Sequence, residues 1–304
     1  MQNKKADINF FALAKRMKRP LILDGAMGSL LQQRGVKMHS ALWMSLANLE
    51  NPEIVKGIHD EYIEAGADII TTNTFRTNPL AINRLTSKKI KGLVRKAVNI
   101  ARAAAGDLPV LIAGSNAPAE DCYQVKRTIT KKELEANHKS HIEELYSNGC
   151  HFILNETQSH FDEIKIISNY CSDNSIPYVI SLFFGNDLNI LSGENLSEII
   201  KFIKDRNALA IGFNCILPST MIKTKRLIKN TKHWGFYLNC GDGAYTDDNI
   251  ECGISPKEYA KHVAEYTTLS PSFIGACCGS GPEHIRELKN ITDGNIKSQN
   301  SRKN

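Results

Sequence analysis

Residues 52–73 read PEIVKGIHDEYIEAGADIITTN, a segment in which a helix pattern is followed by a strand pattern. Asn51 can cap a helix that has Pro52 in its first position, and Gly66 stands where the left-handed end of a helix favours glycine. Residues 67–73 then form a short apolar run that ends in polar residues, which is typical of a parallel strand covered on both faces. The segment predicts a helix over 52–65 and a strand directly after it.

The same alternation of helix and strand patterns recurs along the chain. A capping-box pattern, Thr130-Lys131-Lys132-Glu133, opens another helix, and Gly149 stands just past its end. Alternating helices and strands predict a parallel sheet, and eight such units predict an α/β fold of the (β/α)₈ TIM-barrel type, built as a single domain. The strand-like runs cover residues 21–24, 67–73, 110–115, 151–156, 178–183, 209–215, 235–240 and 273–278.

This interpretation divides the chain into three parts. Residues 1–20 are predicted to form an amphipathic N-terminal helix that packs on the barrel, because Phe10 and Leu13 fall on one face of it. Residues 21–293 form the barrel itself. Residues 294–304 are polar and basic, and we expect them to be a flexible tail.

Composition excludes several classes of protein. The 304 residues are 42% hydrophobic and 23% charged, which is ordinary for a globular chain and excludes a disordered protein, a collagen and a coiled coil. The net charge of +6 is modest and dispersed, so we expect no nucleic-acid partner. No apolar run approaches the roughly 18 residues of a membrane span, and the apolar patch near the N-terminus is too short for a signal peptide. We therefore expect a cytoplasmic protein with no membrane contact, and the sequence leaves its oligomeric state open.

Eight cysteines are present, and in a cytoplasmic chain of this length they are not expected to form a disulfide framework. There is no C-x-x-C pattern, so a zinc ribbon or finger is excluded. The adjacent pair Cys277-Cys278 allows two interpretations, a metal or redox role or two small buried hydrophobic side chains.

The ends of the predicted strands carry polar groups and thiols. In a TIM barrel the active site lies at the carboxyl ends of the strands, so these groups converge on one rim. Gly279 permits a strand break after Cys277-Cys278, and with Cys215 three thiolates can then meet. Three sulfur ligands with an open fourth position are typical of a catalytic zinc site.

The residues at these strand ends carry a resemblance. The chain resembles the homocysteine S-methyltransferase family, which includes betaine- and S-methylmethionine-dependent enzymes and the homocysteine module of cobalamin-dependent methionine synthase. The resemblance implies Zn²⁺ held by Cys215, Cys277 and Cys278, and methyl transfer to L-homocysteine to form methionine. It rests on residues 23–29, 65–68, 71–75, 156–157, 212–215 and 275–285.

The resemblance also implies how homocysteine is held. Glu156 would accept a hydrogen bond from its ammonium group, and backbone N–H groups of residues 25–29 can hold its carboxylate. Asp24 would orient that turn or the ammonium group, and no catalytic residue is expected beyond the substrate thiolate that zinc activates. The predicted substrate-binding residues are Asp24, Gly25, Gly28, Ser29, Thr72, Asn73, Glu156 and Asn239.

Charge arithmetic favours a cationic methyl donor. Three thiolates and Zn²⁺ sum to −1, and a homocysteine thiolate brings the site to −2. We therefore expect a small onium compound such as S-methylmethionine, betaine or dimethylsulfoniopropionate, ranked above S-adenosylmethionine because no nucleotide-binding pattern is present. Trp43 and Phe75 can form a donor pocket by cation–π contact or can belong to the core, and Tyr237 can face the donor or the barrel interior.

Three questions stay open at this point. Residues 114–121 and 237–241 depart from the family pattern, which puts the donor in doubt, and Cys240 can be a spare ligand or a packing residue. A non-catalytic zinc or thiol sensor or store is the alternative function. A barrel lyase or aldolase is a third, but the predicted strand ends carry no lysine.

Overall fold

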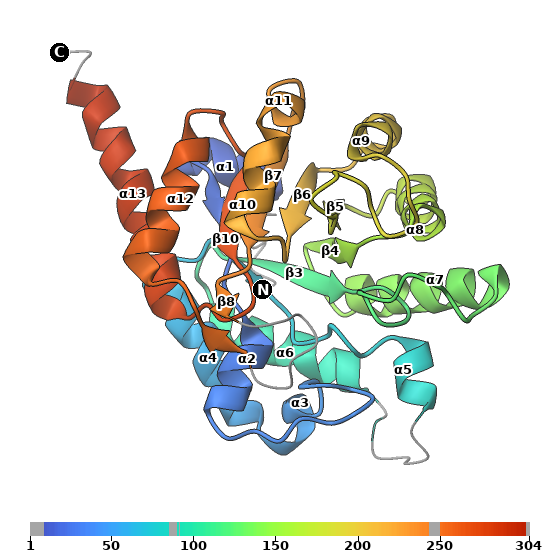
Figure 1. Ribbon diagram of the computed structural model, residues 1–304. Coiled ribbons are helices and arrows are strands. Elements are labelled where there is room, and N and C mark those ends of the chain that lie inside the picture. Colours follow the sequence, from blue (N-terminus) through green and yellow to red (C-terminus); the bar gives the residue numbers. More distant parts are fainter. Residues whose placement is uncertain (1–8, 85–89, 91, 243–249, 302–304) are drawn as a thin grey trace, which may run out of the picture.

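Eight parallel strands form one sheet in the computed structural model of the chain, which describes residues 9–84, 90, 92–242 and 250–301 (Figure 1). The strand order is β1-β10-β7-β6-β5-β4-β3-β2, and a parallel bridge between Leu23 and Ile69 joins the two outer strands. The sheet is thus closed into a ring, and the predicted (β/α)₈ barrel is confirmed. The strands are β1 (Leu21–Ile22), β2 (Ile69–Thr71), β3 (Leu111–Asn116), β4 (Phe152–Gln158), β5 (Tyr178–Leu182), β6 (Ala210–Asn214), β7 (Trp234–Leu238) and β10 (Phe273–Ala276).

Helices surround this sheet and follow the predicted boundaries closely. The helix that begins at Pro52 ends at Gly66, which has a φ of 108°, and Thr130 and Glu133 form the predicted capping box. The helices are α1 (Phe10–Met17), α2 (Met27–Gln33), α3 (Ala47–Glu50), α4 (Pro52–Ala65), α5 (Pro79–Asn83), α6 (Leu93–Ala105), α7 (Lys131–Ser147), α8 (Phe161–Asp173), α9 (Leu196–Lys204), α10 (Pro218–Met221), the 3₁₀ turn η2 (Ile222–Thr224), α11 (Lys225–Ile228), α12 (Pro256–Thr267) and α13 (Pro282–Ser301). None of them, over the described part of the chain, is long and apolar enough to cross a membrane.

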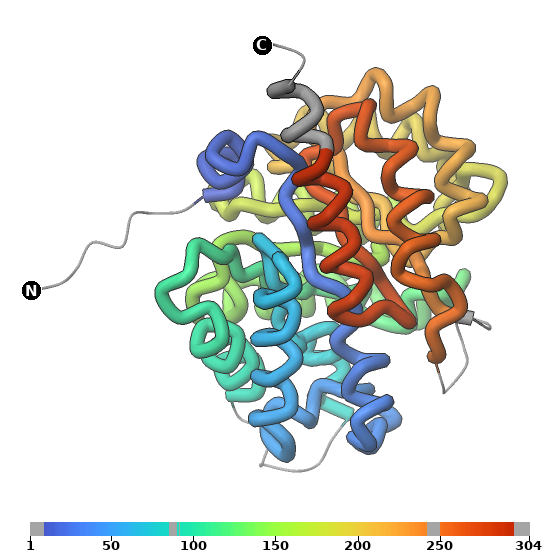
Figure 2. Tube along the Cα trace, turned by 90° about the vertical axis from the view of Figure 1, so that its left-hand side faces the viewer, coloured from blue at the N-terminus to red at the C-terminus, as the bar shows by residue number. Residues whose placement is uncertain are grey.

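Both ends of the chain pack on the barrel. Helix α1 buries Phe10 and Leu13, and the Phe10 ring meets Phe152 at 5.8 Å and Phe273 at 6.3 Å, each edge to face. Those two rings belong to the first residues of β4 and β10, so α1 covers the amino-terminal end of the barrel. At the other terminus α13 lies beside α12 (Figure 2). The bounds of α13 extend past Gly294, where we placed the start of a tail. Residues 1–8 and 302–304 lie outside the described part.

The sequence did not predict a short antiparallel hairpin at the carboxyl end of the barrel. Strand β8 (Gly241–Asp242) pairs with β9 (Glu251–Cys252), so that Gly241 stands opposite Cys252. Two-residue strands have no hydrophobic periodicity that could reveal them. The hairpin places Gly241 next to the cysteines discussed below.

One buried histidine gives the fold a pH dependence. His59 lies on the inner face of α4, fully buried, and no described residue hydrogen-bonds either ring nitrogen. Burial lowers the pKa of His59 to about 4, against about 6.5 in an unfolded chain. Between these values the unfolded state binds a proton that the folded state does not, so stability falls as the pH is lowered from 6.5 to 4, by on the order of 3 kcal/mol for this group.

We therefore expect His59→Leu to reduce the pH dependence of the free energy of unfolding. Urea unfolding at pH 7 and pH 5 measures this. On going from pH 7 to pH 5 the free energy of unfolding should fall less, or rise more, in the variant than in the wild type. His262→Gln, at a half-buried position on α12, serves as the control and should leave the difference unchanged. An identical pH difference in His59→Leu and wild type would contradict the assignment.

Candidate active site

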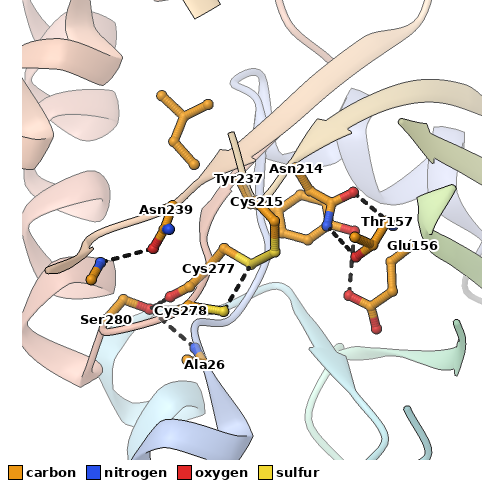
Figure 3. Close-up of a disulfide and its surroundings, with 12 residues drawn as sticks. Ala26, Glu156, Thr157, Asn214, Cys215, Tyr237, Asn239, Cys277, Cys278 and Ser280 are labelled. Atoms are coloured by element: carbon orange, nitrogen blue, oxygen red, sulfur yellow. Dashed lines mark hydrogen bonds between the residues drawn. A yellow bond between two sulfur atoms is a disulfide. The ribbon is translucent and has the colours of Figure 1, made fainter. Parts of the chain in front are cut away.

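Three cysteines meet at the carboxyl end of the barrel. Cys215 directly follows β6, and Cys277 and Cys278 directly follow β10. Their sulfur atoms all lie within 4.8 Å of one another, and Cys277 Sγ lies 3.9 Å from Cys278 Sγ (Figure 3). Cys215 and Cys277 are joined by a disulfide, and the remaining six cysteines are free.

The strand break that brings both adjacent cysteines to the cluster depends on Gly279. Its φ is 79°, a conformation that favours glycine, and a Cβ here would lie 2.5 Å from the Cα of Gly241. Ser280 then fixes the turn, because its hydroxyl donates to the carbonyl of Cys277 at 2.6 Å and accepts from the Ala26 N–H at 3.0 Å. The cysteine pair is thereby tied to the loop that follows β1.

A second set of hydrogen bonds positions Cys215. The N–H of Thr157 donates to the Asn214 side-chain oxygen at 2.9 Å, and the Asn214 amide nitrogen donates to the Thr157 hydroxyl at 2.9 Å. Both Thr157 and Cys215 have positive φ, at 58° and 53°, which costs a non-glycine residue roughly 1–2 kcal/mol. The paired bonds join the ends of β4 and β6 and hold Cys215 in this turn.

Replacing Asn214 by alanine should therefore loosen the cluster without removing a sulfur. The Thr157 N–H would be left buried and unpaired, at a cost of about 1–3 kcal/mol in stability. We expect metal affinity to fall about 10–100-fold, as is usual when a group that orients a ligand is lost. Competition titration with a chromophoric zinc chelator measures this, and an unchanged affinity would show that Cys215 does not depend on the Asn214 bonds.

Two carboxyl groups lie near the cysteines, that of the buried Asp24 and that of the half-buried Glu156. Asp24 accepts from the Thr71 N–H at 2.7 Å and from the Thr71 hydroxyl at 2.8 Å. Glu156 accepts from the hydroxyl of Ser115 and, at 3.4 Å, from that of Tyr237. Burial raises the pKa of Asp24 to about 8 and that of Glu156 to about 7, because no water stabilises the charged form. Such carboxyl groups favour a ligand that brings its own positive charge.

A single cavity of about 410 Å³ holds all of these groups. Its walls include every residue that the sequence predicted for the site, so the structure brings the whole predicted set together. Their individual roles stay predictions. These residues are Asp24, Gly25, Gly28, Ser29, Trp43, Thr72, Asn73, Phe75, Glu156, Cys215, Tyr237, Asn239, Cys277 and Cys278.

Two aromatic rings form one wall of the cavity. Trp43 and Phe75 meet edge to face with ring centroids 5.8 Å apart. Trp43 has a φ of 47°, and a Cβ on Gly28 would lie 2.1 Å from its ring. Gly28 thus provides the space that the indole occupies beside the loop after β1.

Hydrogen bonds hold several of the predicted substrate-binding residues in place in the cavity wall. The hydroxyl of Thr72 lies 2.7 Å from that of Thr74, the Asn73 amide donates to the Met44 carbonyl at 3.0 Å, and Asn239 accepts from the Gly241 N–H at 2.8 Å. The hydroxyl of Tyr237 faces Glu156 in the cavity that both residues line, and a contact of Tyr237 with the donor stays a prediction (Figure 3).

Cys240 stands apart from the three-sulfur cluster. Its thiol is buried and lies 3.7 Å from the Leu238 carbonyl, and its N–H donates to the carbonyl of Cys278 at 2.9 Å. Among the described residues only the other three cysteines form a group suited to a metal. The position of Cys240 thus favours packing over a role as spare ligand.

Sequence reasoning missed the polar residues at the mouth of the cavity. Arg76, Asp121 and Tyr123 line it from the loops after β2 and β3. Ser115 and Thr71, the partners of the two carboxyl groups, were also missed. The one available signal was the departure of residues 114–121 from the family pattern, which marked this loop without indicating what it does.

The donor set of this site fits a soft metal ion. Three cysteine sulfurs from two strand ends, with a cavity beside them, match a zinc site that keeps one position for a ligand. The disulfide between Cys215 and Cys277 must be reduced before both can act as thiolates. In the reduced state the cavity offers three thiols for a metal ion, two carboxyl groups for a cation and an aromatic wall.

The chain is similar in sequence and in fold to known methyltransferases. Residues 21–292 match the family model described as homocysteine S-methyltransferase. The chain is similar to the homocysteine S-methyltransferase of Escherichia coli, with 27% identity over 88% of this chain and 94% of that protein, and to homocysteine S-methyltransferase YbgG of Bacillus subtilis, with 25% identity over 88% and 93%. It is also similar to a selenocysteine Se-methyltransferase of Brassica oleracea, with 23% identity over 94% of this chain and 93% of that protein. In fold it is similar to the metallated form of the homocysteine methyltransferase MmuM from Escherichia coli, with a TM-score of 0.77 and 22% identity over 93% of this chain and 99% of that chain.

Proposed function

The chain belongs to the homocysteine S-methyltransferase family, and from this premise we propose that it is a zinc-dependent enzyme that transfers a methyl group from a small onium donor to L-homocysteine. The observation that supports this most strongly is the meeting of Cys215, Cys277 and Cys278 in one cavity with the carboxyl group of Glu156. Thiols suit the metal, and the carboxyl group suits the ammonium group of an amino acid.

Cys215, Cys277 and Cys278 would hold the metal once the disulfide is reduced. Zn²⁺ bound by thiolates would keep the homocysteine sulfur deprotonated at neutral pH, where a free thiol with a pKa of about 8.5 is mostly protonated. The solved structure of the similar MmuM protein is described as a metallated form, which is consistent with a metal-binding member of this fold.

The cavity walls would orient the amino-acid end of homocysteine. Glu156, which accepts hydrogen bonds from Ser115 and Tyr237, accepts from the ammonium group, and the carboxyl group of Asp24 is a further oxygen acceptor in the same cavity. The first backbone N–H groups of α2, whose N-cap residue Ala26 provides no side-chain cap, face the carboxylate. These contacts hold the sulfur in place for attack.

The transfer itself is a displacement on the methyl carbon. An electron pair of the homocysteine thiolate forms the new S–CH₃ bond, while the pair of the breaking bond stays with the onium sulfur or nitrogen, which leaves as a neutral group. The anionic site and the Trp43–Phe75 wall both favour a positively charged donor. S-methylmethionine, betaine and dimethylsulfoniopropionate all meet this requirement.

A donor panel tests the proposal. Reduced, zinc-loaded protein is incubated with homocysteine and, in turn, with S-methylmethionine, betaine, dimethylsulfoniopropionate, S-adenosylmethionine and methyltetrahydrofolate, and methionine is measured by mass spectrometry. We expect methionine from one or more onium donors and none from the folate. Zinc and homocysteine binding without methionine from any donor would overturn the proposal and favour a sensor or store of zinc and thiols.

A further inference from the structure

Opposite charges face each other at the mouth of the active-site cavity. Arg76 lies in the loop after β2 and Asp121 in the loop after β3, and both line the cavity that holds the three cysteines. The closest approach of the two side chains is 3.8 Å, from Arg76 Nη2 to Asp121 Oδ2. That distance allows an ion pair but is too long for a hydrogen bond. Each group therefore retains capacity for a ligand.

The surroundings of Arg76 fix its guanidinium group in place. The Arg76 side chain is only 17% exposed, its Nη1 donates to the carbonyl of Glu120, and its Cζ lies 5.5 Å from the centroid of the Phe75 ring. The hydrogen bonds of the described residues occupy Nη1 alone. The Nη2 group remains as a donor at the cavity wall.

Asp121 is held by its own backbone turn. Its Oδ1 accepts from the Tyr123 N–H at 2.8 Å, and the side chain is 61% exposed. The carboxyl group is therefore largely exposed to solvent, in contrast to the buried Asp24 and the half-buried Glu156 of the same cavity. It offers an exposed negative charge beside Arg76.

Arg76 also stands out by its charge. Among the described residues that line the cavity, it is the one lysine or arginine, whereas the base carries two carboxyl groups and three cysteines. Arg76 is therefore the one positively charged side chain that the described cavity wall offers to a donor carboxylate. Displacement on the methyl carbon requires the leaving group to point away from the attacking sulfur. Strands β2 and β3 stand across the ring from β6, which carries Cys215, so their loops lie on the side to which a leaving group would point.

Resting on the proposed function, we propose that Arg76 and Asp121 bind the α-amino-acid end of a methylsulfonium donor. Arg76 takes the donor carboxylate and Asp121 takes its ammonium group. Betaine and dimethylsulfoniopropionate carry a carboxylate but no ammonium group, so they can use Arg76 but gain nothing from Asp121. S-methylmethionine carries both charges, and the pair therefore selects sulfonium amino acids.

The substitution Asp121→Asn tests this selection. The new amide oxygen can still accept from the Tyr123 N–H, so the turn is preserved while the charge is lost. We expect kcat/KM for S-methylmethionine to fall about three- to tenfold, mainly through KM, a moderate change because the site is partly hydrated. The values for betaine and dimethylsulfoniopropionate should stay the same or rise. If S-adenosylmethionine is accepted, its value should fall with that of S-methylmethionine.

A matched control is Asp187→Asn. Asp187 is exposed and accepts from the Asn189 N–H at 3.2 Å in the same kind of turn, but it does not line the cavity. This variant should behave as wild type with every donor. Equal losses in both aspartate variants would remove any special role for Asp121.

A second variant and a binding measurement complete the test. Arg76→Gln should lower kcat/KM about tenfold for S-methylmethionine, betaine and dimethylsulfoniopropionate, since each loses the same contact with its carboxylate.

Binding of S-methylmethionine without homocysteine is followed through the fluorescence of Trp43. Asp121→Asn should weaken this binding by the same factor by which it raises KM. If Asp121→Asn raised the KM for homocysteine instead, or lowered the values for all donors alike, the assignment would be overturned. Wild-type protein that makes methionine from no donor would overturn the proposed function, a separate outcome.

Discussion

Cys277→Ala is expected to remove metal binding and methyl transfer together. Cys277 lies within 4.8 Å of both other cluster sulfurs, and no fourth cysteine of the described chain joins the group. Two remaining thiols bind zinc far more weakly than three, and without the metal the homocysteine thiol is mostly protonated at pH 7. Activity should fall to below about one thousandth, a greater loss than the 10–100-fold typical of changes around the ligands.

Metal analysis and methionine formation measure the two effects on the same purified protein. The wild type, reduced and loaded, should hold about one zinc per chain, as expected for one three-cysteine site, and Cys277→Ala should hold little. Cys171→Ala is the control, because Cys171 is a free, fully buried thiol on α8 that does not line the cavity. It should keep its metal and its activity. A full complement of zinc in Cys277→Ala would remove the cluster from the metal site, whatever the activity.

The barrel could be predicted because its signals are local, and the members of the site were predicted from the strand ends together with the family resemblance. Each strand is a short apolar run, and the polar residues directly after it mark the carboxyl end, where a TIM barrel places its chemistry. Gly279 after the cysteine pair signals a break in the strand, and the structure shows the positive φ of 79° that the break needs. The strands and the break after Cys277-Cys278 could therefore be predicted from residues that are adjacent in sequence.

The contacts that could not be predicted join residues that are far apart in the sequence. Asn214 and Thr157 are 57 residues apart, and nothing in either neighbourhood indicates that each supplies the other's hydrogen bond. Arg76 was not singled out from the sequence and Asp121 only as part of the departing residues 114–121, because it is the fold that brings the loops after β2 and β3 to one cavity. The disulfide between Cys215 and Cys277 is also a consequence of the fold, because it joins residues on two different strand ends.

Glu156→Gln is expected to weaken homocysteine binding about 10–100-fold while leaving the metal in place. The substitution keeps the size of the side chain and an oxygen that can accept from Ser115, but it removes the negative charge that the ammonium group requires. A hydrogen bond to a charged group contributes roughly 1.5–3 kcal/mol, which corresponds to this loss of affinity. Calorimetric titration of the zinc-loaded protein with homocysteine measures the affinity, and metal analysis confirms that the cluster is intact.

The pH profile separates a charge effect from a change in shape. Burial raises the pKa of Glu156 to about 7, so in the wild type the carboxylate form is lost as the pH falls below 7 and homocysteine affinity should fall with it. Glu156→Gln has no proton to gain, so its weaker affinity should vary less over the same range. Ser115→Ala is the matched control, because it removes the hydrogen-bond donor to Glu156 and keeps the charge, and it should retain both the pH dependence and most of the affinity. If Glu156→Gln bound homocysteine as tightly as the wild type at pH 8, where the carboxylate is formed, Glu156 would not be the partner of the ammonium group, and Asp24 would be the next carboxyl group of the cavity to test.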